Sequence, residues 1–86
     1  MEKDVENQIK HGVSFEEAKF VFDDPNRITL RDKTHSITED RLFCIGKVNE
    51  LILTVRFTYR KHRIRIIGAG KWRRGKKLYE EKNRIH

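Results

Sequence analysis

The sequence has little that would stabilise a secreted or membrane-bound protein: one cysteine, one proline and no long apolar run in 86 residues. Because Cys44 has no partner within the chain, an internal disulfide is excluded and we expect a buried, structural thiol. No stretch approaches the roughly twenty apolar residues of a membrane-spanning helix, and no signal peptide is recognisable. We therefore expect a cytoplasmic protein without membrane contacts, folded as one domain over residues 1–86.

Acidic residues are absent from one long segment. Residues 60–77 contain nine lysines and arginines and no acid. The net charge of +7 is also unevenly spread, because residues 1–24 carry −4 and residues 25–86 carry +11. A cationic run repels itself unless an anion lies against it, so the sequence predicts a nucleic acid, an acidic protein partner, or both. The alternative is a surface whose charge serves solubility alone.

Metal and nucleotide motifs are also missing. The four histidines and the cysteine show no C-x-x-C or H-x-x-x-H spacing. Residues 68–71 are too short to form a phosphate-binding loop of the G-x-x-x-x-G-K-[ST] type. No nucleophile for acyl transfer is recognisable. We therefore expect neither a metal ion nor a cofactor.

Two alternating runs dominate the second half of the chain. Residues 51–60 alternate between apolar and polar side chains, the period of a strand with one buried face. The alternation resumes at residues 62–69, which predicts an antiparallel hairpin with its turn near residues 60–62. The open face of this hairpin would carry Arg56, Thr58 and Arg60, joined by Arg63 and Arg65 if the register allows.

Two helices are predicted before these strands. Residues 4–10 form a short helix with Val5 and Ile9 on its apolar side, closed by Gly12. Ser14 then begins a capping box, S-x-x-E, at the start of a second helix that ends before Pro25.

The remaining elements complete an α+β pattern. Strands are expected at residues 28–30 and 41–48, with a turn at residues 49–50. A final helix over residues 72–83 would be anchored by Trp72, Leu78 and Tyr79, although Gly75 costs it about 1 kcal/mol relative to alanine. The order predicts two N-terminal helices, an antiparallel sheet of three to four strands and a C-terminal helix.

Cleavage of RNA without a metal fits these residues best. The 2′-hydroxyl of RNA can attack its own phosphodiester if the protein supplies a base, an acid and cations. His35 is an acid or base candidate, and a hydrogen bond that orders its loop beside Ser36 is the alternative. His11 and His62 are interpreted as structural and surface residues.

The predicted catalytic residues are His35, Arg56, Arg60, Arg65 and Lys71. The predicted RNA-binding residues are Arg63, Arg73, Arg74, Lys76 and Lys77, for which paired surface charges are the alternative.

A family resemblance runs through nearly the whole chain. Residues 7–18, N-Q-I-K-H-G-V-S-F-E-E-A, resemble the N-x-x-K-H-G-V-S-F-E-E-A signature of the BrnT toxins, and residues 21–25 match the V-F-D-D-P that comes next in that family. Further matches lie at His35-Ser36 with residues 39–41, at Ile45-Gly46, at Phe57-Thr58 and at residues 63–67.

The resemblance implies a RelE-like α+β fold and a ribonuclease toxin of a type II toxin–antitoxin module. Its partners would be RNA and a BrnA-like antitoxin, which neutralises the toxin and contacts DNA. The toxin itself would then meet DNA only indirectly.

Two departures from the family pattern bear on activity and packing. Where BrnT proteins read I-S-A-R-K, residues 67–71 read I-G-A-G-K, so Gly68 and Gly70 replace a serine and an arginine near the expected active surface. The final helix also contains Gly75. A catalytically inactive module that binds a partner or nucleic acid on the same fold is therefore the alternative to an enzyme.

Overall fold

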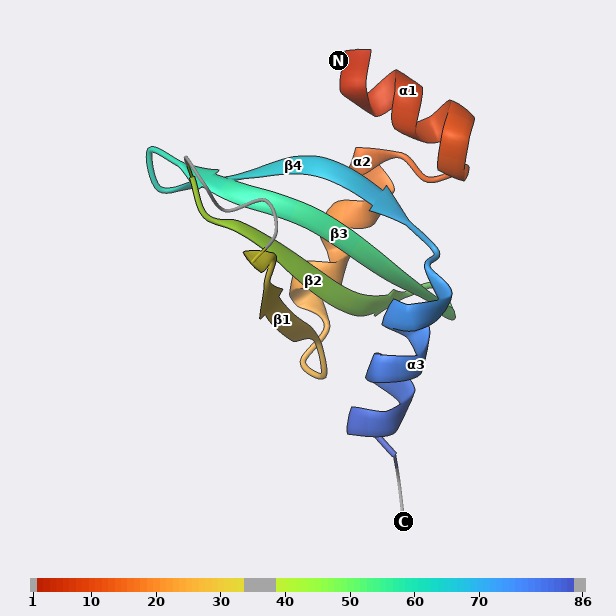
Figure 1. Ribbon diagram of the computed structural model, residues 1–86. Helices are drawn as coiled ribbons and strands as arrows, with labels where there is room; N and C mark the ends of the chain where they lie inside the picture. Colours follow the sequence, from red (N-terminus) through yellow and green to blue (C-terminus); the bar gives the residue numbers. More distant parts are fainter. Residues whose placement is uncertain (1, 34–38, 85–86) are drawn as a thin grey trace.

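The computed structural model describes residues 2–33 and 39–84. Its centre is a four-stranded antiparallel sheet in the order β1-β2-β3-β4 (Figure 1). The strands are β1 (Ile28–Arg31), β2 (Arg41–Val48), β3 (Leu51–Arg60) and β4 (Arg63–Gly70). The helices are α1 (Glu2–His11), α2 (Phe15–Ala18), the 3-10 helix η1 (Lys19–Asp23) and α3 (Arg73–Lys82). The predicted α+β class, antiparallel sheet and C-terminal helix are confirmed. The N-terminal part differs from two simple helices, because η1 continues the short α2.

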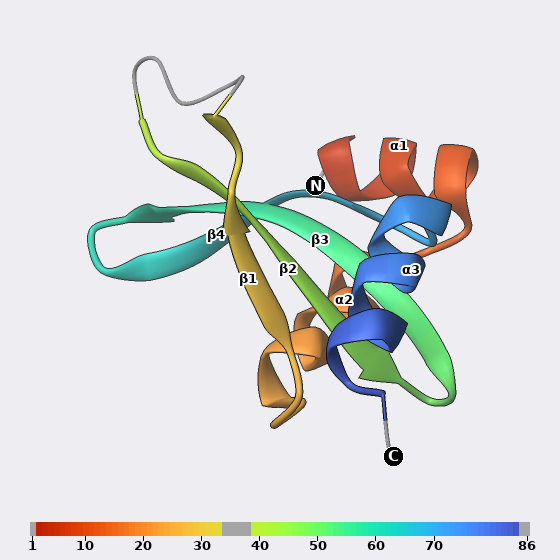
Figure 2. The ribbon, with the colours of Figure 1, turned by 60° about the horizontal axis from the view of Figure 1, so that its bottom comes forward.

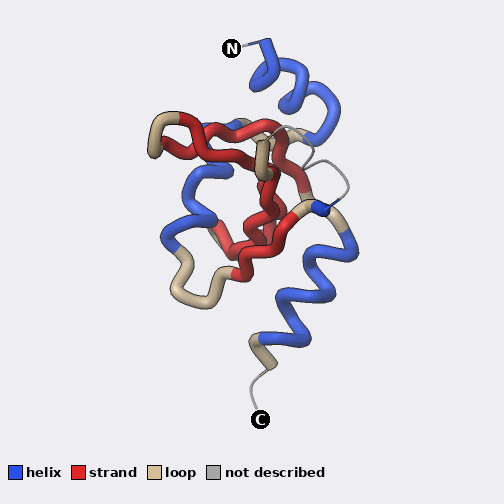
Figure 3. Tube along the Cα trace, turned by 60° about the vertical axis from the view of Figure 1, so that its left-hand side comes forward, coloured by secondary structure: helices blue, strands red, loops and turns tan. Residues whose placement is uncertain are grey.

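The helices divide the sheet into two unlike faces. Figure 3 shows α2 and η1 on one side of the strands and α3 on the other. We call the side under α2 and η1 the closed face, and the side that α3 partly covers the open face. The tip of the β3–β4 hairpin reaches beyond the helices (Figures 1 and 2). Among the described residues, no helix is long and apolar enough to cross a membrane.

Two-residue turns connect the last three strands. The turn from β2 to β3 has positive φ angles at Asn49 (48°) and Glu50 (70°). The turn from β3 to β4 has them at Lys61 (48°) and His62 (65°). Positive φ at both central residues gives a turn whose twist matches that of the strands. Both turns therefore lie where the sequence predicts them, although Glu50 and Lys61 are poor formers of this conformation.

The register decides which face each cation occupies. Thr58 lies opposite Arg65 and Arg60 opposite Arg63, so both arginines of β4 join the face of Arg60. An irregularity in the β3–β4 ladder follows Arg56, which lies opposite Gly68. The open face of the hairpin therefore carries all the arginines that the sequence predicts there. Thr58 is nevertheless buried at 1% exposure, so this face is not open along its whole length.

The closed face holds most of the hydrophobic core. Its buried members from the sheet include Cys44, Leu53, Val55, Phe57 and Ala69, and those from the helical side are Val13, Ala18 and Val21. Gly46 lets η1 lie directly on β2, because a Cβ there would stand 2.7 Å from the backbone oxygen of Val21. Cys44 is fully buried, which confirms the predicted buried cysteine, and this burial raises the pKa of its thiol to about 11.

The N-terminal helices are fixed by polar contacts. The Ser14 side chain accepts a hydrogen bond from the Glu17 N–H at 3.0 Å, which confirms the predicted cap. Helix α1 docks through buried Asn7, whose side chain donates to the Val13 carbonyl (2.6 Å) and accepts from the Ala69 N–H (2.9 Å). The prediction of an apolar contact face was wrong, because Val5 and Ile9 are 56% and 79% exposed.

Helix α3 packs on the open face through a glycine and a tyrosine. A Cβ at Gly75 would lie 2.0 Å from Thr54 Oγ1, so the glycine allows the helix to approach β3 closely. Tyr79 is buried, whereas Leu78 is 37% exposed, so the predicted anchoring by Leu78 was wrong. The Tyr79 hydroxyl donates to the Asp24 carboxylate at 2.5 Å and ties α3 to the end of η1.

Candidate functional site

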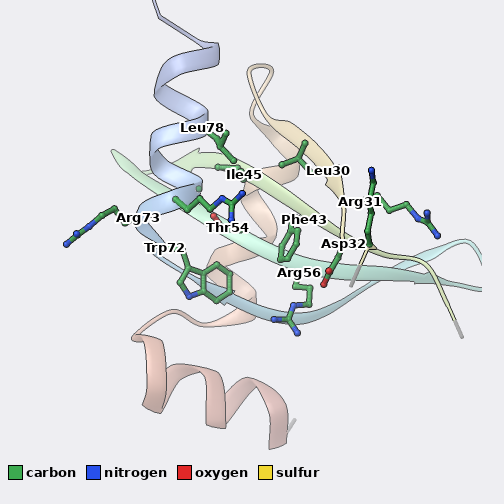
Figure 4. A pocket seen from close by; sticks show the side chains of 13 residues that line it. Leu30, Arg31, Asp32, Phe43, Ile45, Thr54, Arg56, Trp72, Arg73 and Leu78 are labelled. Atoms are coloured by element: carbon green, nitrogen blue, oxygen red, sulfur yellow. The ribbon is translucent and has the colours of Figure 1, made fainter. Parts of the chain in front are cut away.

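An open pocket lies where α3 leaves part of the sheet uncovered. Its volume is about 690 Å³. The floor comes from the open face of β2 and β3: Phe43, Ile45, Thr54 and Arg56. One wall follows β1 and the residues after it: Leu30, Arg31, Asp32 and Lys33. The other wall is the start of α3: Trp72, Arg73, Arg74, Gly75 and Leu78 (Figure 4).

Positive charge dominates this lining. Within the described part of the chain, five cations and one acid, Asp32, border the pocket: Arg31, Lys33, Arg56, Arg73 and Arg74. Arg31 pairs with Asp40 at 3.0 Å, an exposed pair that solvent screens. The cations come from β1, the residues after it, β3 and α3, and Figure 4 shows Arg31 and Arg73 at the border with their side chains directed outward. A pocket of this kind attracts anions.

Arg56 is the cation in the floor. Its Nε is buried and has no hydrogen-bond partner within the described residues. Its guanidinium lies 5.9 Å from the centroid of the Phe43 ring, a cation–π contact that orients it. Figure 4 shows the carboxylate of Asp32 on the same side of the pocket as Arg56. A buried donor without a partner is unusual in a folded protein, and a bound anion would supply one.

Trp72 forms the corner between β4 and α3. It is half-buried, and its ring meets that of His11 edge-on with centroids 5.7 Å apart. A Cβ at Gly70 would lie 3.3 Å from the indole ring, so the indole takes the space beside this glycine. The interpretation of His11 as a structural residue agrees with this contact: His11 is the last residue of α1, and its ring packs against Trp72.

Gly68 and Gly70 lie beside the pocket floor. The register places Gly68 opposite Arg56 and Gly70 opposite Thr54, both on the open face. A Cβ at Gly68 would meet only the Asn7 side chain, at 3.8 Å. Gly68 therefore leaves no β4 side chain opposite Arg56, and Gly70 leaves none opposite Thr54.

The predicted site residues separate into three groups. Arg56, Arg73 and Arg74 line the pocket. Arg60 lies four residues further along β3, about 13 Å from Arg56 at the usual rise of a strand. The other predicted cations that the structure leaves outside the lining are Arg63, Arg65, Lys71, Lys76 and Lys77, all exposed. His35 lies outside the described residues.

The hairpin cations extend the positive surface beyond the pocket. Arg60 and Arg63 face each other across β3 and β4, a like-charge pair that is unfavourable by itself. Glu39 lies 3.5 Å from Arg60 and 4.0 Å from Arg41 and offsets part of this charge. The catalytic cations that the sequence predicts on β3 and β4 are therefore spread along the hairpin and do not converge on one point.

Sequence reasoning missed several pocket residues. Asp32, Phe43 and Thr54 were not predicted as site residues, and Trp72 was predicted as an anchor of the final helix. The strand register carries the missing signal, because Leu30 pairs with Phe43 and Phe43 pairs with Arg56. Alternation within each strand would have placed these side chains on the open face once the pairing was known.

No group of three or more His, Cys, Asp or Glu side chains that could hold a metal ion is found within residues 2–33 and 39–84. The two polar side chains of the pocket floor are Thr54 and Arg56, and the acid of its wall is Asp32. These groups can bind an anion and accept a proton.

A family model described as the ribonuclease toxin BrnT of type II toxin–antitoxin systems matches residues 1–75. A search of curated proteins finds no match. The matched range includes the whole sheet and every pocket residue except Leu78. The chain therefore belongs to the BrnT family of ribonuclease toxins of type II toxin–antitoxin systems.

Proposed function

We propose that this chain is an endoribonuclease that cleaves RNA in the open pocket between β1 and α3 without a metal ion. The observation that supports this most strongly is Arg56, a cation in the floor of a pocket with five cations, whose buried Nε lacks a protein partner within the described residues. Family membership indicates the reaction, and the pocket supplies positive charge where a phosphate would bind.

The proposed reaction uses the RNA itself as nucleophile. The 2′-hydroxyl oxygen attacks the adjacent phosphorus, the bond to the 5′ oxygen breaks, and a 2′,3′-cyclic phosphate and a 5′-hydroxyl result. Arg56 stabilises the charge that develops on the phosphate oxygens, while Arg73 and Arg74 hold flanking phosphates. Asp32 accepts the proton of the 2′-hydroxyl, and His35, which the sequence offers as an acid or a base, is now proposed to protonate the leaving oxygen.

Further predictions on fold, location and partner belong to this proposal. The fold is RelE-like, and the toxin acts in the cytoplasm. Its partner is a BrnA-like antitoxin that competes with RNA for the basic open face and that alone contacts DNA. Trp72, half-buried at the pocket, and Phe20, 49% exposed, are the aromatic residues that we expect this antitoxin to cover.

Substitution of Arg56 tests the proposal. Arg56→Ala should lower RNA cleavage by a factor of about 100 or more, the usual loss when one donor to a developing oxyanion is removed. Lys82→Ala, which removes an exposed cation at the end of α3, is the matched control and should cleave normally. The assay contains EDTA and is accompanied by circular dichroism of both variants. Full activity of Arg56→Ala, or loss of wild-type activity in EDTA, would contradict the mechanism.

A nucleic-acid-binding protein without catalysis is the second candidate function. Gly68 and Gly70 favour it, because they leave no β4 side chain opposite Arg56 and Thr54. In that case the wild-type protein binds RNA with a strong salt dependence and yields no cleavage product at any protein concentration. Measuring binding and cleavage on the same RNA separates the two functions.

A further inference from the structure

We infer that the part of the pocket between Leu30 and Leu78 binds one unpaired nucleobase of the RNA, an inference that rests on RNA being the substrate. Leu30 comes from β1, Leu78 from α3, and Ile45 of β2 lies between them in the floor (Figure 4). Phe43 separates this part from Arg56, because it pairs with Leu30 on one side and with Arg56 on the other.

The two leucines are placed at a point where β1 and α3 diverge. These elements pack together through the buried cluster of Ile28, Ile45 and Tyr79. Leu30 follows Ile28 by two residues and so projects from the same face of β1. Leu30 is nevertheless 41% exposed and Leu78 is 37% exposed. An apolar slot therefore opens directly beside a closed apolar contact, and the core does not fill it.

The charges around the slot select its occupant. Arg73 and Arg74 line the same wall as Leu78. If a basic protein inserted an apolar side chain into the slot, its own cations would be repelled by these arginines. A nucleotide instead joins a flat base, which buries apolar surface, to a phosphate that the arginines bind. The volume of about 690 Å³ lies within the range of pockets that hold small ligands.

The shape of the slot also restricts the RNA to unpaired segments. A base within a duplex has both faces covered by its neighbours and its pairing edge occupied. It can enter between Leu30 and Leu78 only after it leaves the stack. A base in a single strand needs no such step, so single-stranded RNA should bind more tightly than the same sequence within a stem.

A binding cycle with a non-cleavable RNA tests this inference. The probes are short fluorescent 2′-O-methyl oligonucleotides, which lack the attacking hydroxyl, either intact or with one abasic position moved along the strand. The protein variants are the double change Leu30→Ala with Leu78→Ala, and Leu51→Ala as control. Leu51 is 44% exposed, similar to the slot leucines, but lies next to the β2–β3 turn. Fluorescence anisotropy gives each Kd.

The expected result is a coupling between the leucines and one base. The double variant should raise the Kd of the intact oligonucleotide about tenfold, because it removes apolar surface that the base would bury. One abasic position should raise the Kd of the wild type by a similar factor. For the oligonucleotide with that abasic position, the double variant and the wild type should have the same Kd. Leu51→Ala should match the wild type throughout. Unchanged affinity of the double variant, or an equal loss for intact and abasic probes, would overturn the inference.

Failure of the subsite and failure of the ribonuclease proposal can be told apart. If the coupling is found but the wild type does not cleave unmodified RNA, the subsite stands and the catalytic proposal falls. If Arg56 is required for cleavage but no abasic position couples to the leucines, the subsite falls alone.

Discussion

The two faces of the sheet are built from the same strands and have opposite character. On β3, the alternate residues Leu53, Val55 and Phe57 are at most 2% exposed on the closed face. Their neighbours on the open face, Thr54 and Arg56, carry buried polar atoms that have no partner within the described residues. One strand thus fills the core with one set of residues and lines the pocket with the alternate set. The comparison leads us to expect that stability and the proposed RNA binding can be changed independently.

The largest effect should come from the closed face. Phe57 is 2% exposed and packs edge-on against the rings of Phe22 (5.0 Å) and Tyr59 (5.6 Å). Phe57→Ala should reduce the free energy of unfolding by about 3–5 kcal/mol. Phe43→Ala, the matched change on the open face, should cost clearly less because that ring is only half-buried. Urea titration followed by circular dichroism measures both, and an equal cost would remove the distinction between the faces.

A smaller effect is expected where α3 meets the open face. Gly75→Ala should destabilise the protein by up to about 2 kcal/mol, because overpacking against Thr54 Oγ1 exceeds the gain of about 1 kcal/mol in helix propensity. In a Thr54→Ala background the nearest remaining atom, the Cβ of residue 54, lies 3.4 Å from the new methyl group. There the same change should become neutral or stabilising. A double-mutant cycle checks this, and equal destabilisation in both backgrounds would exclude the steric explanation.

The smallest of these effects concerns the contact that joins the two faces. Burial disfavours the charged form of Asp24, but hydrogen bonds from Tyr79, Asn26 and Lys47 outweigh it, so the pKa of Asp24 lies below its ordinary value. A carboxylate with a lowered pKa contributes stability that is complete above the unfolded-state pKa of about 3.9 and is lost as the pH falls through the folded-state pKa. Tyr79→Phe should therefore cost about 1 kcal/mol near neutral pH and less in acid.

The same contact has an alkaline counterpart. Burial, and then the bond to Asp24, raise the pKa of Tyr79 to about 12. A tyrosine whose pKa is raised by folding contributes stability that is complete below the unfolded-state pKa of about 10. This contribution is lost as the pH rises towards the folded-state value. Unfolding free energies of the wild type and Tyr79→Phe, measured across the pH range, should converge at both extremes. Coincident curves would show that the hydrogen bond contributes nothing, and a constant offset would show that its contribution is not linked to the ionisation of Asp24 or Tyr79.

Local patterns predicted most of the secondary structure. The alternation of β3, the break at Lys61 and the cap at Ser14 depend on neighbours in the sequence, and each lies where it was expected. The docking of α1 was mispredicted because one buried amide, Asn7, replaces the apolar contact that Val5 and Ile9 suggested. A single polar residue gives no periodic signal.

The site was less predictable because it depends on long-range placement. Arg56 was named from its face of β3, and Arg73 and Arg74 from the cationic run. The pocket itself requires β1 to pair with β2 and α3 to cross the sheet. Neither the pairing of β1 with β2 nor the placement of α3 is determined by residues within one segment. The sequence therefore could not show which arginines line the pocket and which, like Arg60 and Arg65, lie on the hairpin.

The position of Trp72 gives the protein its own spectroscopic probe. The chain has one tryptophan, so its fluorescence at long excitation wavelengths comes from a single indole. That indole lines the pocket and touches the His11 ring, so anything that enters or covers the pocket changes its surroundings. Occupancy by RNA or antitoxin can therefore be followed on unlabelled protein, and the emission reports the rim of the pocket without interference from the core.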